Sequence, residues 1–388
     1  MTPGARAQAA IDLLDEIIAS ARGGGAAADT LIARYFKTRR YAGSKDRRAI
    51  RELVYRAIRR SGNIPDHGRA ALVGLAREDD AVAALFDGGA HAPSPIEPVE
   101  AGSDGLVLPD WLSTRIAPEE PTALLERAPL DVRVNLARTD RASMASALAA
   151  ELTPFSPAGL RLPEGSPVEA SEPWAQGLVE IQDEGSQLIA LAARAAPGMT
   201  VLDLCAGAGG KTLAMADSMG GQGRLIASDS NRARLSRLAP RAGRTGGIAI
   251  ETRLLDPGRE SAALADLAGR CDVVLVDAPC SGTGTWRRNP EARWRLTPAR
   301  LAQLVELQAR LLDIAAPLVK PGGALVYAVC SVLPEEGRLQ ADAFLERHRD
   351  YRFDQPGFIA GRQDGAGRLL TPAHDRTDGF FVARLVRA

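Results

Sequence analysis

Short apolar runs alternate with helical patterns from Met199 to the end of the chain, and this alternation restricts the fold more than any other feature. Strands joined through helices form parallel sheets, because a parallel neighbour is reached only by a crossover connection. We therefore predict an α/β domain over residues 197–388, with a Rossmann-like, mostly parallel sheet. The runs that predict its strands are VLDLC from Val201, RLIASD from Arg224, IAIETRLLD from Ile248, DVVLVDAP from Asp272, LVYAVCS from Leu325 and FFVARLVR from Phe380.

Two further parts precede this domain. Residues 1–128 carry apolar side chains at helical spacing, such as Ile11, Leu14 and Ile18, and predict an all-α domain. The segments DVRVNLA and LVEIQDEGSQLIALAAR alternate strand and helix patterns, so residues 129–196 predict a small α/β module. The turn signal Ala196-Pro197-Gly198 marks its end.

Charge is balanced over the whole chain, with 48 basic and 48 acidic residues, and this balance excludes no class of partner. Locally, the stretch from Lys37 to Arg60 is strongly basic, and its only acidic residues are Asp46 and Glu52. Aromatic side chains flank the stretch. It fits either contact with RNA phosphates or an ordinary solvated helix face, and both interpretations stay open.

Several other classes are disfavoured. The four cysteines show no CxxC spacing and histidines are few, which argues against a structural metal and against a disulfide framework. No apolar run is long enough to span a bilayer, and the first residues predict an amphipathic helix rather than a signal peptide. We expect a cytoplasmic protein in a reducing compartment, without metal or membrane contact.

A glycine-rich turn, AGAGGKT from Ala206 to Thr212, follows the first predicted strand and opens a helix. Such turns bind the anionic or polar part of nucleotide-like ligands. The dinucleotide fingerprint would need a glycine at Thr212, and the phosphate loop of nucleoside triphosphatases would need one at Cys205. S-adenosylmethionine, which has a carboxylate and an amine but no phosphate, fits better than either.

Three acidic residues at successive strand ends support this cofactor. Asp203, Asp229 and Asp256 end the first, second and third predicted strands. Asp229 lies 26 residues after Asp203, a suitable distance for an acid that accepts from both ribose hydroxyls. Aspartate at a strand end also caps helices, but three in succession favour a ligand site.

Two cysteines stand at the ends of the fourth and fifth predicted strands. Cys280 and Cys330 are each followed by serine, and neighbouring strands of such a sheet deliver both thiols to one crevice. A lone cysteine is more often a small buried apolar residue than a nucleophile, but two at equivalent positions favour chemistry.

Methylation of a pyrimidine at C5 is the chemistry that needs such thiols. C5 is a poor nucleophile, and addition of a thiolate to C6 raises its electron density. A carboxyl group must stabilise the charge that develops at N3 and the 2-oxo oxygen. Asp277, three residues before Cys280, suits this role as a general acid. A second cysteine can then assist release.

The chain from about Val132 onward resembles the Sun family of RNA 5-methylcytosine methyltransferases, and within it the enzymes of bacterial small-subunit ribosomal RNA. The motifs that carry the resemblance are IQDEGSQ, DLCAGAGGKT, SDSNRARLSRL, DAPCSGTGTWRRNPEARW, YAVCSVLPEE and TDGFFVARL. The resemblance implies a class I S-adenosylmethionine methyltransferase domain. For residues 1–128 it implies, by position and helical character, a NusB-like RNA-binding domain.

The resemblance also assigns roles to individual residues. It implies Cys330 as the nucleophile, Cys280 as the residue that aids product release, and Asp277 as a contact of the cytosine edge. The complete set of expected cofactor contacts is Asp203, Cys205, Ala206, Gly207, Ala208, Gly209, Gly210, Lys211, Asp229, Arg234, Asp256 and Asp277.

The sequence departs from the family pattern at two places. The cofactor turn of the family usually has alanine-proline where Gly207 and Ala208 stand, which should loosen the turn without removing a charged group. The family usually has threonine before the nucleophile, where this chain has Val329 and therefore lacks a hydroxyl beside the thiol.

A basic and aromatic segment follows the Cys280 loop. Arg287, Arg288 and Arg293 lie among Trp286 and Trp294, a mixture suited to phosphate contact and stacking on unpaired RNA. We expect the three arginines to contact RNA and Trp294 to be a core residue. The target base must leave its stack to expose C6, so a loop or bulge is the expected substrate.

These observations predict a monomeric RNA cytosine-C5 methyltransferase that uses S-adenosylmethionine. Small-subunit ribosomal RNA is the expected substrate, with transfer RNA as the alternative. A non-catalytic RNA-binding assembly factor on a relict fold would have lost a cysteine or Asp277, and all three residues are present. A phosphate-loop NTPase is the remaining class, against which Cys205 argues.

Overall fold

The computed structural model describes residues 1–105, 107–247 and 249–388. Ile248, with which the third predicted strand begins, lies outside these residues. The described residues divide into two compact units. The helical unit comprises Met1–Arg127 with Thr285–Thr297, and the α/β unit comprises Ala128–Gly284 with Pro298–Ala388.

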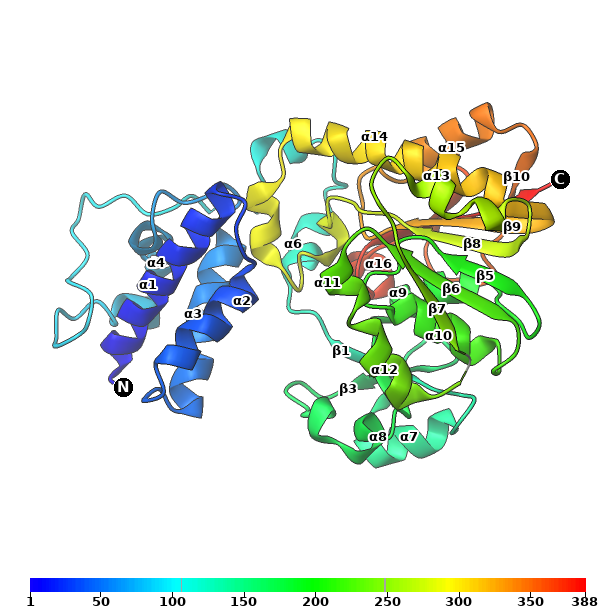
Figure 1. The fold of residues 1–388 in the computed structure, drawn as a ribbon. Coiled ribbons are helices and arrows are strands. Elements are labelled where there is room, and N and C mark those ends of the chain that lie inside the picture. Colours follow the sequence, from blue (N-terminus) through cyan, green and yellow to red (C-terminus); the bar gives the residue numbers. More distant parts are fainter. Residues whose placement is uncertain (106, 248) are drawn as a thin grey trace. The chain divides into compact units, whose positions relative to one another are not determined.

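The helical unit is built from amphipathic helices around one apolar core, drawn in blue and cyan in Figure 1. Their inward faces bury Leu14, Ile32 and Ile58 completely or almost completely. Gly68 begins α4 at a close approach to α1, where an added Cβ would lie 2.3 Å from the Ile11 carbonyl oxygen. The predicted helical region is therefore present, and its NusB-like character stays a prediction. Its helices are α1 (Pro3–Arg22), α2 (Ala28–Thr38), α3 (Ser44–Arg60), α4 (Gly68–Ala76), α5 (Asp80–Ala83) and α6 (Glu120–Leu125).

The α/β unit begins with a small antiparallel sheet of order β2-β3-β1-β4. This sheet lies within the predicted module 129–196 and has its own core around Val132, Leu160 and Val179. The module nevertheless belongs to the same compact unit as the larger, mostly parallel sheet. Its elements are β1 (Leu130–Val134), α7 (Arg141–Leu148), β2 (Glu151–Leu152), β3 (Gly159–Leu162), α8 (Glu172–Ala175), β4 (Val179–Ile181) and α9 (Glu184–Ala192).

The larger sheet has the order β11-β12-β13-β9-β8-β5-β6-β7, and β10 pairs with β13. The strands from β9 to β7 are parallel, and β13 joins β9 antiparallel. The predicted α/β class is therefore confirmed. The strands are β5 (Thr200–Asp203), β6 (Arg224–Asp229), β7 (Ile250–Leu254), β8 (Cys271–Asp277), β9 (Val319–Val329), β10 (Tyr351–Asp354), β11 (Arg362–Asp364), β12 (Gly367–Leu370) and β13 (Phe380–Arg387).

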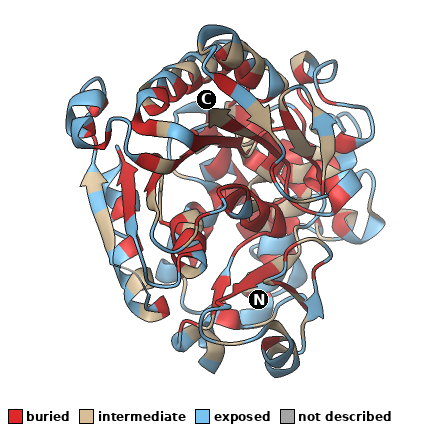
Figure 2. Cartoon of the chain, turned by 90° about the vertical axis from the view of Figure 1, so that its right-hand side faces the viewer, coloured by how far each residue is buried: buried red, intermediate tan, exposed pale blue. Residues whose placement is uncertain are grey.

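Helices cover both faces of this sheet, which explains the unbroken apolar sequence of β8. Successive side chains point to opposite faces: Val273 and Leu275 join the core under α9 and α10, whereas Val274 and Val276 join the core under α14 and α15. Figures 1 and 2 show the strands buried between these helices. The remaining helices are α10 (Gly210–Ser218), α11 (Arg232–Leu235), α12 (Leu238–Thr245), α13 (Glu260–Ala263), α14 (Pro298–Ala315), α15 (Arg338–Arg347) and α16 (Pro372–Asp375).

Candidate active site

The positions of the two cysteines that were expected to be catalytic follow from the pairing of β8 with β9. The two strands are parallel, and Asp277 at the end of β8 lies opposite Ala328 near the end of β9. The chain therefore leaves both strands on the same edge of the sheet. The Sγ atoms of Cys280 and Cys330 lie 3.3 Å apart, within reach of a shared hydrogen bond.

The serine after each cysteine belongs to a hydrogen-bond network that ties the two loops together. The hydroxyls of Ser281 and Ser331 lie 3.3 Å apart, and the hydroxyl of Thr283 lies 2.9 Å from that of Ser331. The backbone N–H of Val332 donates to Thr283 at 3.0 Å. These bonds fix the loop conformation on which the distance between the thiols depends.

Asp277 is joined to Lys211 at the first turn of α10. The Lys211 Nζ lies 2.6 Å from Asp277 Oδ2, and both side chains are largely buried. Burial alone would lower the pKa of Lys211, but the Asp277 carboxylate outweighs it and raises this pKa above its ordinary value. The ion pair therefore places a cation beside the acid that was expected to contact the cytosine.

The four cysteines differ in environment. The hydrogen bond with Cys330 and burial raise the pKa of Cys280 well above the usual thiol value. Burial also raises the pKa of Cys205, and it raises that of Cys271, at the opposite end of β8, to about 12. Cys271 is completely buried and is a core residue, and Cys205 packs against the same core.

The glycine-rich turn between β5 and α10 has the backbone that its sequence requires. Gly207 and Gly209 adopt φ of 57° and 84°, a region that side chains disfavour. A Cβ on Gly209 would lie 2.2 Å from Leu238 Cδ1. Asp229 braces the turn, because its carboxylate accepts from the N–H of Gly207 at 2.8 Å and of Asn231 at 2.6 Å.

Asp203 carries a carboxylate oxygen without a protein partner. Its Oδ2 accepts from the Thr212 hydroxyl at 2.6 Å, whereas its buried Oδ1 has no hydrogen-bond partner among the described residues. Burial raises the pKa of Asp203 to about 7, and the negative charges of Asp277 and Asp229 add to the effect. A buried acceptor of this kind indicates a missing donor, such as a ligand amine.

A polar cavity of about 280 Å³ lies against these acids. Its described lining combines acidic and basic side chains with the aromatic face of Phe380, which suits a ligand that carries both an amine and a carboxylate. The residues that line it are Ile181, Gln182, Asp183, Ser186, Asp203, Ala206, Gly210, Lys211, Arg241, Asp277, Asp378 and Phe380.

Comparison with known proteins identifies the chain. A family model described as 16S rRNA methyltransferase RsmB/F matches residues 189–386. A protein of Synechocystis, named probable ribosomal RNA small subunit methyltransferase B, is 38% identical over 304 residues, which cover 72% of this chain and 67% of that protein. The chain belongs to the RsmB/F methyltransferase family.

A second relative supports this assignment, and a solved structure shares the fold. Ribosomal RNA small subunit methyltransferase B of Salmonella arizonae is 36% identical over 300 residues, which cover 74% of this chain and 68% of that protein. The structure of NSun6 from Pyrococcus horikoshii with SFG shares the fold, with a TM-score of 0.64 and 17% identity; the match covers 72% of this chain and 97% of that chain. As an RsmB/F methyltransferase, the chain uses S-adenosylmethionine as its methyl donor.

The cavity also distinguishes among the expected cofactor contacts of this RsmB/F chain. Asp203, Ala206, Gly210, Lys211 and Asp277 line it. The other expected contacts, which are Cys205, Gly207, Ala208, Gly209, Asp229, Arg234 and Asp256, are not among the described residues of its lining. Arg234 and Asp256 are exposed, the former on α11 and the latter beyond the end of β7. Cofactor contact stays a prediction for the residues that line the cavity as well as for these seven.

Sequence reasoning missed several residues of the cavity. Asp183 and Gln182 come from the IQDEGSQ motif, and Asp378 and Phe380 come from TDGFFVARL. Both motifs had contributed to the family resemblance without receiving a chemical role. Arg241 on α12 also lines the cavity, and it donates to the Ala208 carbonyl at 2.7 Å. Its sequence surroundings give no signal of this contact.

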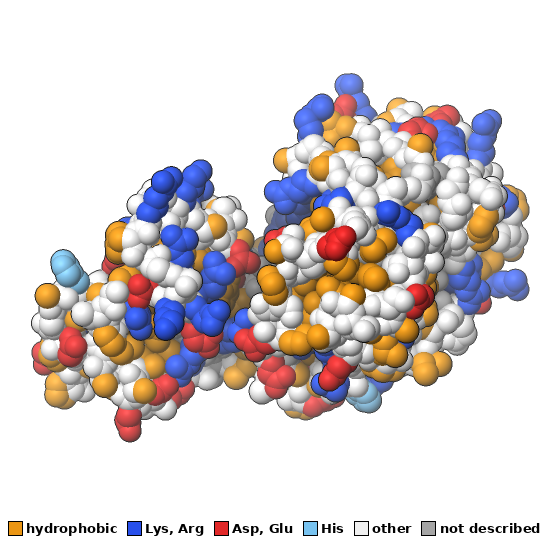
Figure 3. Space-filling model, turned by 90° about the horizontal axis from the view of Figure 1, so that it is seen from below, with side chains coloured by type: hydrophobic (Ala, Val, Ile, Leu, Met, Phe, Trp, Pro, Cys, Tyr) orange, Lys and Arg blue, Asp and Glu red, His pale blue; other side chains and the backbone are white. Residues whose placement is uncertain are grey.

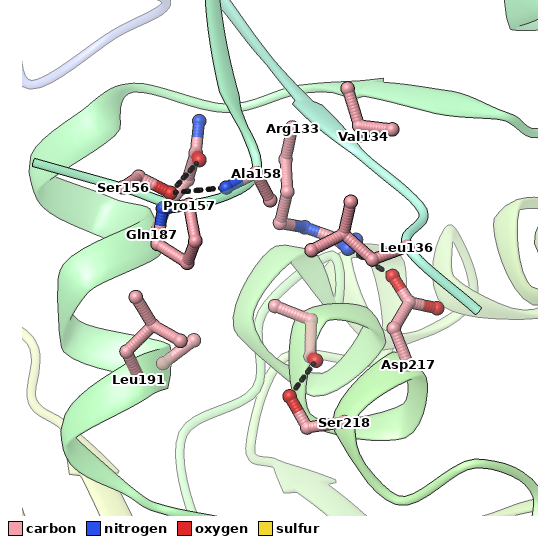
Figure 4. A pocket seen from close by; sticks show the side chains of 12 residues that line it. Arg133, Val134, Leu136, Ser156, Pro157, Ala158, Gln187, Leu191, Asp217 and Ser218 are labelled. Atoms are coloured by element: carbon pink, nitrogen blue, oxygen red, sulfur yellow. Dashed lines mark hydrogen bonds and ion pairs between the residues drawn. The ribbon is translucent and has the colours of Figure 1, made fainter. Parts of the chain in front are cut away.

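A second pocket of about 170 Å³ separates the small module from α9 and α10. Figure 4 shows Arg133 of β1 reaching Asp217 of α10 as an ion pair, and Ser156 bonded to Gln187. The remaining lining is mostly apolar. We assign this pocket to the packing of the module against α10, the helix that also carries Lys211.

The arginines expected to contact RNA are more buried than the sequence suggests. Arg293 is fully buried, and its guanidinium donates to the carbonyls of Ile58 at 2.6 Å and Ser61 at 2.8 Å, at the end of α3. Burial lowers its pKa to about 9. Arg293 thus holds the helical unit together, which replaces the expected RNA contact. Arg287 is also buried, and Arg288 is half-buried.

Both tryptophans of this segment are buried. Trp294 is 9% exposed and donates its Nε1–H to the Ser61 carbonyl at 2.7 Å, as suits the core residue that it was expected to be. Trp286 is completely buried as well, so its ring faces no solvent. Glu291, between them, accepts from the Ala28 N–H at 2.9 Å and thereby caps the start of α2.

The basic stretch from Lys37 to Arg60 is partly used within the helical unit. Arg56 pairs with Asp79, and Arg60 pairs with Glu78. Arg39 stacks on the Tyr35 ring, with its Cζ 3.6 Å from the ring centroid. Figure 3 shows Lys and Arg side chains gathered on the surface of this unit. The exposed basic residues of α2, α3 and their connection are Arg34, Lys37, Arg40, Lys45, Arg48 and Arg51.

In the described part of the chain, no helix has the length and apolar character needed to cross a membrane. Nor do the described residues contain a cluster of His, Cys, Asp or Glu side chains that could hold a metal ion.

Proposed function

We propose that this chain methylates C5 of a cytosine in small-subunit ribosomal RNA through a covalent adduct between Cys330 and C6 of the base. The observation that carries the proposal is the pair of thiols 3.3 Å apart, beside the Lys211–Asp277 ion pair. The names of two relatives support ribosomal RNA as the substrate, because both name a ribosomal RNA small subunit methyltransferase B.

In the first step the Cys330 thiolate attacks C6 of the cytosine. A C6–S bond forms, and the electron pair of the C5–C6 double bond moves into the ring toward N3 and the 2-oxo oxygen. The Lys211–Asp277 pair holds an exchangeable proton within a 2.6 Å hydrogen bond, so it can place that proton on N3 as the charge develops. C5 thereby becomes nucleophilic.

S-adenosylmethionine, when bound, supplies an electrophilic methyl group to C5. The fit of the cavity to this cofactor rests on the free Oδ1 of Asp203, which can accept from the cofactor's amine. Asp183 and Asp378 add further acceptors, and Lys211 and Arg241 are the cations of the lining. These residues bind and orient the donor beside the ring.

Release reverses the addition. A base removes the proton from C5, the double bond re-forms, the C6–S bond breaks and the N3 proton returns to the Lys211–Asp277 pair. Cys280 lies beside Cys330. After the Cys280 thiol has lost its own proton, its thiolate is placed to remove the proton from C5. The thiol then exchanges that proton with solvent.

Bisulfite sequencing of RNA from cells with and without the gene tests the proposal. We expect one or a few cytosines of small-subunit ribosomal RNA to lose protection when the gene is deleted. Loss of protection in transfer RNA alone would replace the proposed substrate with the alternative. Unchanged protection in all RNA would contradict methylation and favour a non-catalytic assembly factor.

A further inference from the structure

A buried carboxylate lies directly behind the Cys280 loop and has no part in the chemistry described above. Glu336 follows β9 in the sequence YAVCSVLPEE and is completely inaccessible to solvent. Burial of a carboxylate costs free energy, because the charge loses its hydration. The contacts of Glu336 therefore indicate what role the buried carboxylate has.

Glu336 is held by neutral donors rather than by a cation. Its Oε1 accepts from the Ser281 N–H at 2.8 Å and from Gln308 Nε2 at 3.0 Å. Its Oε2 accepts from the Ser281 hydroxyl. Acceptance on both oxygens is the pattern of an ionised carboxylate, whose charge these donors spread without cancelling.

These bonds fix the position of Cys280. Ser281 is the next residue, and both its N–H and its hydroxyl are bound to Glu336. Gln308 of α14 donates to the Pro279 carbonyl at 3.0 Å as well as to Glu336. The residues before and after Cys280 are thus anchored to one carboxylate and one amide, which sets the 3.3 Å distance to Cys330.

The same carboxylate distinguishes two otherwise similar thiols. Cys330 and Glu336 both contribute negative charge that raises the pKa of Cys280. The other titratable groups near the pair include Tyr327, a neutral phenol whose hydroxyl donates to the backbone carbonyl of Glu336, and Lys211, whose cation is paired with the Asp277 carboxylate. The Glu336 carboxylate therefore disfavours a second negative charge on Cys280.

We propose that Glu336 is a positioning residue that anchors the Cys280 loop and keeps the proton shared by the two thiols on Cys280, so that Cys330 becomes the nucleophile. When the pair loses one proton to solvent, the remaining one stays on Cys280. This inference rests on the proposed methyl transfer. It explains why two adjacent cysteines take different roles.

Thiol labelling measures this selectivity without RNA. The reduced full-length protein is treated with a limiting amount of iodoacetamide between pH 6 and 10, and labelling of each cysteine is quantified by peptide mass spectrometry. In the wild-type protein we expect Cys330 to react first. In Glu336→Gln, we expect the ratio of Cys330 to Cys280 labelling at pH 8 to fall by about tenfold, since a neighbouring charge shifts a pKa by about one unit or more. An unchanged ratio and pH profile would overturn the proposal.

Two further variants separate charge from structure. Asp272→Asn removes a carboxylate from the opposite end of β8, where Asp272 pairs with Lys320, and should leave the ratio unchanged. Glu336→Asp keeps the charge and should preserve most of the selectivity. If Glu336→Gln loses S-adenosylmethionine binding through misfolding, Glu336→Asp decides: a ratio near 1 in that folded variant would overturn the role of the charge.

Failure of the proposed function would look different. Wild-type protein that labels selectively at Cys330 but methylates no RNA would contradict the proposed function and leave the thiol asymmetry standing. Wild-type protein that methylates RNA but labels Cys280 and Cys330 equally, with no response to Glu336→Gln, would contradict the inference alone.

Discussion

At the scale of single residues, the site depends on differences between chemically identical groups. Cys280 and Cys330 are both half-buried, yet Cys280 alone is followed by a residue bound to Glu336. Asp203 and Asp277 both lie at strand ends, yet only Asp277 has a cation on its carboxylate. Environment therefore assigns the roles that residue type leaves open.

Replacement of the nucleophile should abolish methylation without affecting cofactor binding. Cys330→Ala removes the atom that adds to C6, while the cavity that fits S-adenosylmethionine does not include Cys330 in its described lining. Methyl incorporation into RNA should fall below detection, and the dissociation constant for S-adenosylmethionine should stay within twofold. Cys271→Ala is the matched control and should keep its activity, because Cys271 is a buried core residue. Retained activity of Cys330→Ala would refute its assignment.

Asp203 makes stability depend on pH. Burial raises its pKa from 3.8 to about 7, so the folded state binds more protons than the unfolded state between these values. The free energy of unfolding therefore falls as pH rises from about 4 to about 7, by at most about 4 kcal/mol from this residue. Without ligand, Asp203→Asn should unfold at a higher temperature than the wild type at pH 8, and the difference should shrink toward pH 4.

Calorimetry measures the thermal stability of this variant, and a binding assay measures its affinity for S-adenosylmethionine. The same Asp203→Asn variant should bind S-adenosylmethionine more weakly, since the free acceptor is removed. A variant whose thermal stability follows pH as the wild type does would show that Asp203 is not the group responsible.

At the scale of elements, the segment Thr285–Thr297 stabilises helix ends, whereas the loop before it carries Cys280. Its Arg293 and Trp294 cap the carbonyl end of α3, and its Glu291 caps the amino end of α2. Each charge has the sign that the helix end favours. The segment returns from the active-site loop to complete the helical unit.

Loss of the Arg293 cap should destabilise the protein. Arg293→Met keeps the apolar stem but leaves buried carbonyls at the end of α3 without donors, which should cost about 2–4 kcal/mol. Urea unfolding should show this loss, and Arg300→Met, an exposed arginine, is the control. Weaker RNA binding with unchanged stability would instead restore Arg293 as an RNA contact.

The sequence predicted the elements of the parallel sheet because local periodicity determines them. β5, β6, β8 and β9 appear where apolar runs occur, and the pairing of β8 with β9 places Cys280 beside Cys330. In the segment Thr285–Thr297 the core position of Trp294 was expected, but the burial of Arg293 was missed, because arginine beside tryptophan occurs both in cores and on surfaces. Its partners lie more than 200 residues away in the chain.

The same limit applies to Glu336 and to the cavity. The role proposed for Glu336 depends on its hydrogen bonds with Ser281 and Gln308, which come from other elements. Asp183 and Asp378 meet at the cavity although nearly half of the chain separates them. The strands β10, β11 and β12 were missed because they are short and half-exposed, without a continuous apolar run.

At the scale of the whole molecule, the proposed site for S-adenosylmethionine lies on one unit and a basic surface lies on the other. The described cavity lies within the α/β unit, and the exposed basic side chains of α2 and α3 lie on the helical unit. We expect RNA affinity and cofactor affinity to be separable by mutation for this reason.

Neutralising the basic surface should weaken RNA binding alone. For every RNA phosphate that the variant no longer binds, the slope of log affinity against log salt should become shallower by roughly 0.7. RNA binding at several salt concentrations gives this slope, and S-adenosylmethionine affinity should not change. The variant combines Lys37→Gln, Arg40→Gln, Lys45→Gln and Arg48→Gln. The control with the same change in charge combines the exposed positions Arg259→Gln, Arg270→Gln, Arg349→Gln and Arg352→Gln. Equal effects of both variants would contradict an RNA surface on the helical unit.

The Cys280→Ala variant tests whether Cys330 forms a covalent adduct with the RNA. Without Cys280 the methylated base cannot lose its C5 proton efficiently, so enzyme and RNA should stay joined. Incubated with small-subunit ribosomal RNA and S-adenosylmethionine, this variant should form a complex that survives a denaturing gel. Mass spectrometry should place the RNA on Cys330, and adding Cys330→Ala should abolish the complex. Absence of any denaturation-resistant complex, or one attached to another residue, would contradict the mechanism.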